Sequence, residues 1–449
     1  MMTDLPLAIL KVFAIFTPLF SRSVFKNALQ LFLGHVLCKN RRTITEILRQ
    51  LGLKNIKNYS KYHWVFSGAK WCSFQGSKIL LLNLGKICSK NIVISIDSTI
   101  ERRKGPNIKG LGRQRDAVQS TKENKVLVIG LNWLVCAIHI QFPWASKIWA
   151  CPFLSVLMPP KNPLSSSKNK SDLKKLKRHK TLNEWACQIV RIISKWIGKI
   201  KGITIVADSA FATYILANTC IDNTVSLISR MRLDARTFNF PIINKNGRPR
   251  LVGKRLPTFE QLAKDLSQVW QKINVKWYGE TNKEVEVLTG LCLWYGYGIR
   301  PVPIKWVLIK IDKEYTVLFS TNLNHTPEYI IETFVERWQL ESTFEECRRH
   351  LGIETQRQWS DKSIDRTTPC LFASYSVINL MALELTKDKN EEIPIQECSW
   401  YKKKRPTFSD VLNYLRLEIL KTKYFSKFSK KVDLGKSPLY ELVSLLAAA

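Results

Sequence analysis

Asn91-Ile-Val-Ile-Ser-Ile-Asp97 sets the architecture of this 449-residue chain. The run is short, rich in β-branched residues and ends in a carboxylate, which is the pattern of a buried strand. Ile203-Thr-Ile-Val-Ala-Asp208 repeats that pattern further along the chain. Strand ends in an open α/β sheet face a common crevice, so Asp97 and Asp208 are expected to lie side by side despite their separation in sequence.

Other strands and helices are predicted around these two runs. Asn132 either turns the chain between two strands or bends one long strand. The predicted elements of this region are strands over residues 126–131 and 133–140, a helix over 182–197, a strand over 203–208, a helix over 211–217 and a strand over 225–229. Strands alternating with helices predict an α/β fold.

The predicted helices and strands and the distribution of charge divide the chain into five parts. Residues 41–53 have the cap, apolar face and final glycine of a short helix, which belongs either to a helix-turn-helix or to a plain helical bundle. The five predicted parts are a helical domain (1–90), the first part of an α/β core (91–231), a β-rich insertion (232–325), two helices that complete the core (326–385) and a basic tail (386–449).

Charge is the outlier of the composition. Lys and Arg number 70 against 36 Asp and Glu, which gives a net charge of +34 and predicts a polyanionic partner such as nucleic acid. The basic loop over 159–180 is either a solvated linker or a phosphate-contacting arm.

The cysteines are scattered along the chain and no export signal is present, which favours a protein of the reducing cytoplasm. The spacing of the cysteines makes a zinc site unexpected. The apolar stretch over 5–20 is too short to span a membrane. It predicts a buried helix and no membrane contact.

A late helix carries the remaining candidate acid. Thr326-Pro-Glu is a strong helix start, and the helix is expected to run to Leu351, where Gly352 ends it. A second helix is expected over 368–385. Helical spacing places Arg337, Glu341, Glu345 and Arg348 on one face of the late helix.

Three acids in this chain order predict a metal site for phosphodiester chemistry. Asp97, Asp208 and Glu341 would form a set of hard oxygen ligands for two Mg2+ ions roughly 3.5–4 Å apart around a scissile phosphate. Glu345, one turn beyond Glu341, is the alternative third ligand. The tryptophans of the insertion either stack on a flipped base or pack in the core, and the core is the preferred interpretation; they are Trp270, Trp277 and Trp294.

The motifs that contain these acids resemble those of bacterial insertion-sequence DDE transposases of the IS-four-like superfamily. The resemblance covers roughly residues 25–385. The matching motifs are Asp97-Ser-Thr-Ile-Glu-Arg-Arg, Lys109-Gly, Arg115-Asp116, Gly130-Leu-Asn-Trp, Ala207-Asp-Ser-Ala-Phe, Ser229-Arg-Met-Arg-Leu-Asp, Asn246-Gly-Arg-Pro-Arg, Glu336-Arg-Trp-Gln-Leu-Glu-Ser-Thr-Phe-Glu-Glu and His350-Leu-Gly-Ile-Glu-Thr-Gln.

The resemblance implies a fold and a set of residue roles. The fold is an RNase H-like mixed sheet flanked by helices, with a β-rich insertion before the last catalytic helix and a helical N-terminal domain that binds transposon ends. The family signature Tyr-x2-Arg-x3-Glu-x6-Lys falls on Phe334, Arg337, Glu341 and Arg348. Glu341 would be catalytic with Asp97 and Asp208, and the other three would bind DNA. Phe334 keeps packing but lacks the tyrosine hydroxyl, and Arg348 keeps the positive charge of lysine.

The resemblance also implies a reaction and its partners. Two Mg2+ ions, with Mn2+ as substitute, would promote attack of water on the phosphodiester at a transposon end. The freed 3′-hydroxyl would then attack the opposite strand or the target DNA. The partners would be double-stranded DNA, as terminal inverted repeats and target, and a second copy of the chain in a homodimer on paired ends, associated with the nucleoid in the cytoplasm. The alternatives are a metal-dependent endonuclease without joining activity and an inactive DNA-binding relic.

Overall fold

The sheet is the central feature of this computed structural model. The structure describes residues 5–39, 41–88, 91–116, 119–121, 123–161, 163–164, 179–198, 200–242, 250–278, 280–311 and 314–422. Its strands are β1 (Asn91–Arg102), β2 (Gly112–Arg115), β3 (Leu127–Ile140), β4 (Trp149–Met158), β5 (Gly202–Ala207), β6 (Val225–Met231), β7 (Thr237–Phe238), β8 (Gln271–Trp277), β9 (Glu280–Trp294), β10 (Val302–Ile311) and β11 (Glu314–Ser320). Within the described residues, these eleven strands form one sheet in the order β2-β3-β1-β5-β6-β11-β10-β9-β7, with β4 beside β3 and β8 beside β9.

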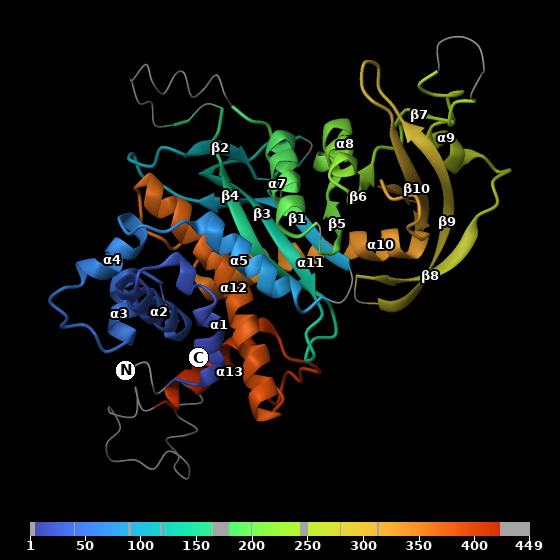
Figure 1. Cartoon of the computed structure of the whole chain (residues 1–449). Helices are drawn as coiled ribbons and strands as arrows, with labels where there is room; N and C mark the ends of the chain where they lie inside the picture. The colour runs from blue at the N-terminus through green and yellow to red at the C-terminus, as the bar shows by residue number, and fades with distance from the viewer. Residues whose placement is uncertain are drawn as a thin grey trace.

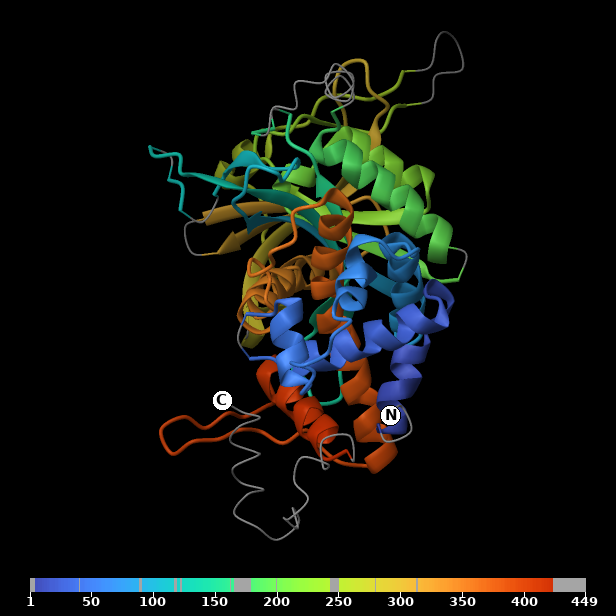
Figure 2. The same ribbon diagram turned by 90° about the vertical axis from the view of Figure 1, so that its left-hand side faces the viewer.

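Helices cover both faces of the sheet (Figures 1 and 2). They are α1 (Leu7–Ala14), η1 (Thr17–Leu19), α2 (Arg22–Leu37), α3 (Ile44–Gln50), α4 (Ser60–Ser67), α5 (Ser73–Gly85), α7 (Leu182–Ile197), η2 (Ser209–Phe211), α8 (Tyr214–Asp222), α9 (Phe259–Lys264), α10 (Pro327–Glu336), α11 (Trp338–Leu351), α12 (Asp361–Lys389) and α13 (Phe408–Leu420). α5, α7 and α8 lie on one face, and α10, α11 and α12 lie on the other.

The pairing of β1 defines the core topology. β1 pairs antiparallel with β3 on one side and parallel with β5 on the other, and β5 pairs parallel with β6. β4 lies antiparallel to β3 beyond it. This mixed sheet with helices on both faces confirms the expected RNase H-like fold.

The strands of the β-rich insertion extend this sheet. β11 pairs antiparallel with β6, β10 pairs with β11 and β9, and β9 pairs with β7 and β8. The insertion strands form the curved end of the sheet in Figure 1. Residues 243–249, which include most of the motif Asn246-Gly-Arg-Pro-Arg, lie outside the described residues.

The predicted first strand ends later than expected. β1 continues past Asp97 to Arg102, because its pairing with β3 continues to Arg102 opposite Gly130. Its pairing with β5 stops earlier, at Ile96 opposite Ala207. Asp97 therefore lies at the point where β5 ends beside a continuing β1.

Several other boundaries also differ from the predictions. Of the two interpretations of Asn132, one long strand is confirmed, because β3 runs through this residue. The helix predicted over 211–217 is replaced by η2 and α8, because the Thr213 hydroxyl caps a new helix by accepting the N–H of Leu216 at 3.4 Å. β2 and β4 were not predicted; β4 contains Pro152, which an edge strand tolerates.

The late helix is broken at Arg337, so the prediction of one continuous helix is wrong. Its start and end are as predicted: the Thr326 hydroxyl accepts the N–H of Tyr329, and Gly352 adopts a φ of 77°. At the break, the N–H of Arg337 bonds to the carbonyl of Phe334, and the N–H of Leu340 bonds to the carbonyl of Arg337. These hydrogen bonds join residues three apart, as in a 3₁₀ turn, and replace the four-residue spacing of an α-helix. α10 and α11 are therefore separate helices.

The following helix is longer than predicted, and the basic tail contains a packed helix. α12 begins at Asp361, seven residues before the predicted start, and includes Pro369. Proline removes one backbone hydrogen bond, and the burial of neighbours such as Thr368 and Phe372 offsets that loss. In the tail, α13 packs on α12 and α2. Most of the predicted polar loop (165–178) and residues 423–449 lie outside the described residues.

One described helix, α12, passes the length and composition test for a membrane span. Within its most apolar window, 83% of the residues are buried inside the fold. Burial of this kind is typical of a core helix.

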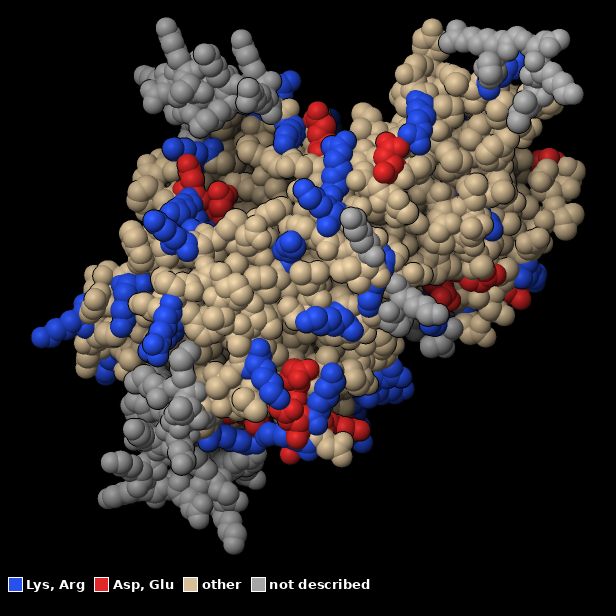
Figure 3. All heavy atoms as spheres, in the orientation of Figure 1, with Lys and Arg blue, Asp and Glu red and all other residues tan. Residues whose placement is uncertain are grey.

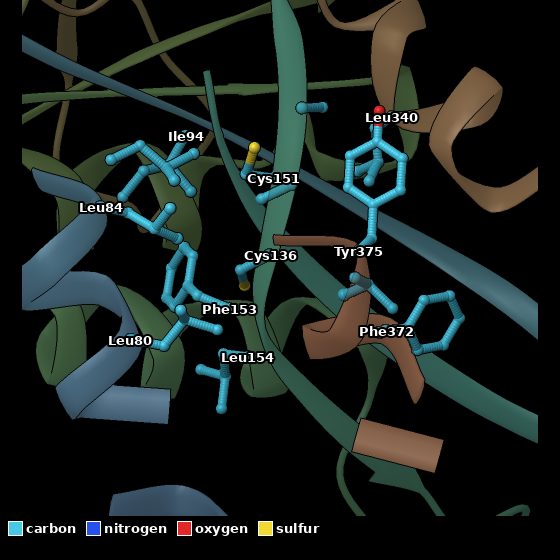
Figure 4. Close-up of a cluster of buried hydrophobic side chains, with 14 of the residues drawn as sticks. Leu80, Leu84, Ile94, Cys136, Cys151, Phe153, Leu154, Leu340, Phe372 and Tyr375 are labelled. Atoms are coloured by element: carbon cyan, nitrogen blue, oxygen red, sulfur yellow. The ribbon is translucent and has the colours of Figure 1, made fainter. Parts of the chain in front are cut away.

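The core lies on both sides of β3 and β4 (Figure 4). Leu80 and Leu84 of α5 pack on one side, and Leu340 of α11 and Tyr375 of α12 pack on the other. The helix that carries Glu341 is thus joined to the sheet by the same apolar core that holds β1.

A buried ion pair anchors the far end of β1. The Glu101 carboxylate, fully buried, accepts hydrogen bonds from Arg103 at 2.7 Å, from the Trp133 indole at 2.8 Å and from the Thr368 hydroxyl at 2.8 Å. Arg103 also donates to the backbone carbonyl of Gln358. These bonds connect β1 to β3, to α12 and to the segment that follows α11.

We expect Glu101→Ala to lower the free energy of unfolding by about 3–5 kcal/mol, because it leaves the Arg103 charge buried without its carboxylate. Urea denaturation measures the change. The control is Glu260→Ala, which removes an exposed carboxylate paired with Lys264 and should change stability by less than about 1 kcal/mol. Equal effects of the two substitutions would contradict the structural role of Glu101.

Candidate active site

The register of β1 and β5 brings the two aspartates together. Ile96 pairs with Ala207 in the last parallel pair, and Asp97 and Asp208 are the next residues of their chains. The sequence prediction that these two side chains lie side by side is therefore matched by the strand pairing.

Local hydrogen bonds hold Asp208 in place. Its carboxylate accepts the N–H of Ala210 at 3.0 Å, so it caps η2. Its backbone carbonyl accepts the hydroxyl of Ser229, a buried residue of β6, at 2.7 Å. Asp208 is thus fixed by η2 and by β6, and its carboxylate keeps further lone pairs for a ligand.

Arg337 joins the first aspartate to the late glutamate. One guanidinium nitrogen lies 3.1 Å from Asp97 Oδ2, and another lies 3.1 Å from Glu341 Oε1. The exposed fractions of the side chains are 11% for Arg337, 17% for Asp97 and 34% for Glu341. Glu341 in the first turn of α11 therefore faces the same site as Asp97, and water still reaches it.

The electrostatics of Asp97 place all three acids in one site. Burial raises the pKa of Asp97 to about 6. The Arg337 guanidinium opposes this rise, as does the hydrogen bond from the N–H of Ser98, whereas the Asp208 and Glu341 carboxylates add to the rise. A buried carboxylate with two further carboxylates nearby is an environment that a bound cation relieves.

The chemistry of these side chains fits a divalent cation. Carboxylate oxygens are the ligands that Mg2+ and Mn2+ prefer, and Asp97, Asp208 and Glu341 would hold the ion. Over the described ranges, no three His, Cys, Asp or Glu side chains already surround one ion position. The Arg337 guanidinium lies between two of the three carboxylates and supplies the positive charge there.

The other acids of the late helices lie elsewhere. Glu345, the alternative ligand, is exposed and pairs with Arg349. Glu332 of α10 accepts the N–H of Lys276 of β8 at 3.0 Å. Neither carboxylate contributes to the electrostatic environment of Asp97 given above.

The three predicted DNA-binding residues occupy different environments. Phe334 is partly buried, and its ring centre lies 5.7 Å from the Arg337 guanidinium. Arg348 donates to the Thr99 hydroxyl at 2.6 Å and lies 3.4 Å from a carboxylate oxygen of Glu354. The side chain of Arg348 is 38% exposed, so it connects α11 to β1 and still reaches the surface.

The tryptophans of the insertion pack against other rings. Trp294 is buried with its ring centre 4.2 Å from that of Tyr214. Trp270 lies near Tyr315, and Trp277 is partly buried in a second apolar cluster. These contacts favour the core interpretation over base stacking for the three residues.

A polar ladder along β1 was missed by the sequence analysis. Asp97 contacts Arg337, Thr99 contacts Arg348, and Glu101 contacts Thr368, so alternate residues of the strand bond to the segment that runs from α11 to α12. Successive side chains of a strand point to opposite faces, so these three share one face. The signal was present in the sequence as polar residues at every second position from Ser95 to Glu101.

One comparison with known proteins bears on this site. A family model described as DDE superfamily endonuclease matches residues 15–284 of the chain. A search of curated proteins found no match to the chain. The matched segment includes Asp97 and Asp208 and ends before α10, so the place of Glu341 rests on its contact with Arg337.

We expect Asp97→Asn to stabilise the chain at pH 8 without divalent ions. The folded-state pKa of Asp97 is about 6, above the value of about 4 in an unfolded chain, so ionisation of this carboxyl opposes folding. The gain should be about 1–3 kcal/mol at pH 8, should shrink as the pH falls through 6 and should vanish near pH 4. Urea unfolding across this pH range measures it, and a gain independent of pH would contradict the buried charge.

Proposed function

The chain belongs to the DDE superfamily endonucleases, and on that premise we propose that it is an insertion-sequence DNA transposase of the IS-four-like type. It would cleave DNA at transposon ends and join the freed ends to target DNA. The observation that carries this proposal is the Arg337 guanidinium 3.1 Å from both Asp97 and Glu341, with Asp208 on the neighbouring strand. Cleavage of DNA is the activity of the family; the joining step and the transposon ends are the parts proposed here.

The proposal assigns the catalytic role to three carboxylates. Asp97, Asp208 and Glu341 would bind the divalent ions that this class of endonuclease generally uses, and we propose two Mg2+ ions, with Mn2+ as substitute. Such ions polarise the scissile phosphodiester and lower the pKa of an attacking water or 3′-hydroxyl. The chain itself contributes a rigid frame, because Asp97 and Asp208 follow paired strand residues.

Arg337 would exchange partners when DNA enters. In the DNA-free chain its guanidinium neutralises Asp97 and Glu341. Asp97 and Glu341 would hold a divalent ion, and the Arg337 guanidinium fork would then be available to a phosphate beside the cut. Phe334 would keep Arg337 oriented through the contact of ring and guanidinium. The exposed part of Arg348 would bind a second phosphate from the other end of α11.

The remaining assignments concern partners. The N-terminal helices would recognise terminal inverted repeats, and two copies of the chain would pair two ends. The net charge of +34 supports a DNA partner because basic side chains release counterions from the phosphate backbone.

An endonuclease without joining activity is the second candidate. The description of the matching family, which names an endonuclease and no transfer step, favours it. Incubation of labelled transposon ends with a supercoiled plasmid separates the two: a transposase joins label to plasmid, whereas a plain endonuclease only shortens the labelled duplex. Cleavage without any joined product would overturn the transposase proposal.

We expect Asp97→Asn, Asp208→Asn and Glu341→Gln each to reduce strand cleavage by about a hundredfold or more, because each removes an oxygen that would hold the cation. A gel assay with Mg2+ measures cleavage, and a mobility-shift assay should show that DNA binding persists. Glu345→Gln is the matched control on the same helix and should cleave as the wild type does. A variant of the first three that cleaves normally would remove that residue from the site.

A further inference from the structure

The segment between α12 and α13 forms a projecting arm that the proposed function leaves unused. We define the aromatic-basic arm as residues 396–405. Cys398 and Tyr401 form an isolated two-way backbone bridge, so Ser399 and Trp400 make a tight turn at its tip. In Figure 2 this loop projects from the lower left of the molecule, away from the side on which α7 and α8 lie.

Both legs of the arm are fixed to α13. The buried Asp410 carboxylate accepts the N–H of Gln396 at 3.1 Å from one leg and the Lys403 ammonium at 3.0 Å from the other. It also accepts the N–H of Thr407 at 2.8 Å, and Asn413 bonds to the Gln396 side chain. The arm is therefore presented on a rigid base, which lowers the entropy lost when its tip binds a partner.

The tip combines exposed aromatic rings with unneutralised basic side chains. Trp400 is 86% exposed and Tyr401 is 61% exposed. Lys402, Lys404 and Arg405 are exposed on the following residues, and Glu397 is the acid on the arm. Within the described residues, Lys403 forms an ion pair with Asp410, whereas Lys402, Lys404 and Arg405 have no carboxylate within 4.0 Å. Aromatic rings beside positive charges are the chemistry that binds bases, sugars and phosphates of nucleic acid.

The base of the arm lies at the end of the helix that carries Glu341. The Phe408 ring, at the start of α13, lies 6.3 Å from the His350 ring in the last turn of α11. Nine residues of α-helix separate Glu341 from His350, which is about 14 Å along the axis. A duplex that reaches the acids and follows α11 would therefore meet the arm.

We propose that the aromatic-basic arm is a second DNA-contacting element, which grips the duplex beside the cleavage site. Lys402, Lys404 and Arg405 bind backbone phosphates, and Trp400 and Tyr401 pack against the sugars and base edges of a groove. This inference rests on the proposed function for the place of the cleavage site, and it goes beyond it by assigning duplex binding to the arm, independently of joining.

The test measures DNA binding by the full chain in the absence of divalent ions, so that no cleavage occurs. The probe is a fluorescein-labelled duplex of about 40 base pairs of arbitrary sequence, titrated at several salt concentrations. Lys402→Ala/Arg405→Ala should reduce the slope of log affinity against log salt by about 1.8, because each lost phosphate contact contributes about 0.9. Trp400→Ala should weaken binding by roughly fivefold or more and leave the slope unchanged.

The matched control is Arg191→Ala/Lys195→Ala, which removes the same charges from the exposed side of α7. Basic side chains are spread over that face of the molecule in Figure 3. The control should leave the slope near the wild-type value. All substituted residues are exposed, and thermal melting checks that each variant is folded.

Two results would overturn the proposal. The first is that both arm variants bind DNA with the wild-type affinity and the wild-type salt slope, or that the control variant shows the same changes as the arm variants. The second is unchanged DNA binding together with a loss of self-association in sedimentation, which would assign the arm to contact between copies of the chain. Because binding is measured without cleavage, these outcomes are independent of whether the wild type cuts or joins DNA.

Discussion

The contact of Arg337 with Asp97 and Glu341 is the interaction on which the rest of this site depends. Burial raises the pKa of Asp97 above its ordinary value, and the nearby Asp208 and Glu341 carboxylates add to that rise. The Arg337 guanidinium, 3.1 Å from both Asp97 and Glu341, opposes that rise and offsets part of the cost of burying the Asp97 charge. A guanidinium fork forms paired hydrogen bonds with carboxylates and with phosphates alike, so the same side chain suits both kinds of partner.

The position of Arg337 is set by the contacts of β1 with α11 and α12. β1 is paired on both edges, and one of its faces carries a row of polar side chains that ends in the buried Glu101. This row bonds to residues of α11 and α12, while Leu340 and Tyr375 pack on the sheet beside it. Apolar packing supplies most of the attraction between the sheet and the helices α11 and α12. The polar row fixes their relative position, because its hydrogen bonds are lost when the helices slide along the sheet. The break between α10 and α11 occurs at the residue that reaches into this row.

How far the sequence predicts this structure depends on whether an element is set by local or distant contacts. The start of α10 at Thr326-Pro327 and the stop at Gly352 were predicted, because a capping hydroxyl, a proline and a glycine act within one turn. The end of β1 was placed too early, since the residues after Asp97 are held in the strand only by β3. β4 was missed because Pro152 argues against a strand unless the residue lies at a sheet edge. The helix break had no local signal, because nothing in Glu336-Arg-Trp disfavours a helix.

The sequence by itself determined the types of the catalytic candidates and their order, because two apolar runs that each end in aspartate and a late helix rich in glutamate are local patterns. It also determined a strongly basic surface, because net charge is a sum over residues and needs no fold. Only the tertiary structure decided that Glu341 and not Glu345 lies at the site of Asp97. The Arg337 guanidinium contacts both Asp97 and Glu341, whereas Glu345 is exposed and paired with Arg349. The tertiary structure alone decided that Trp400 stands in solvent, because exposure is a property of what packs nearby and not of the residue itself.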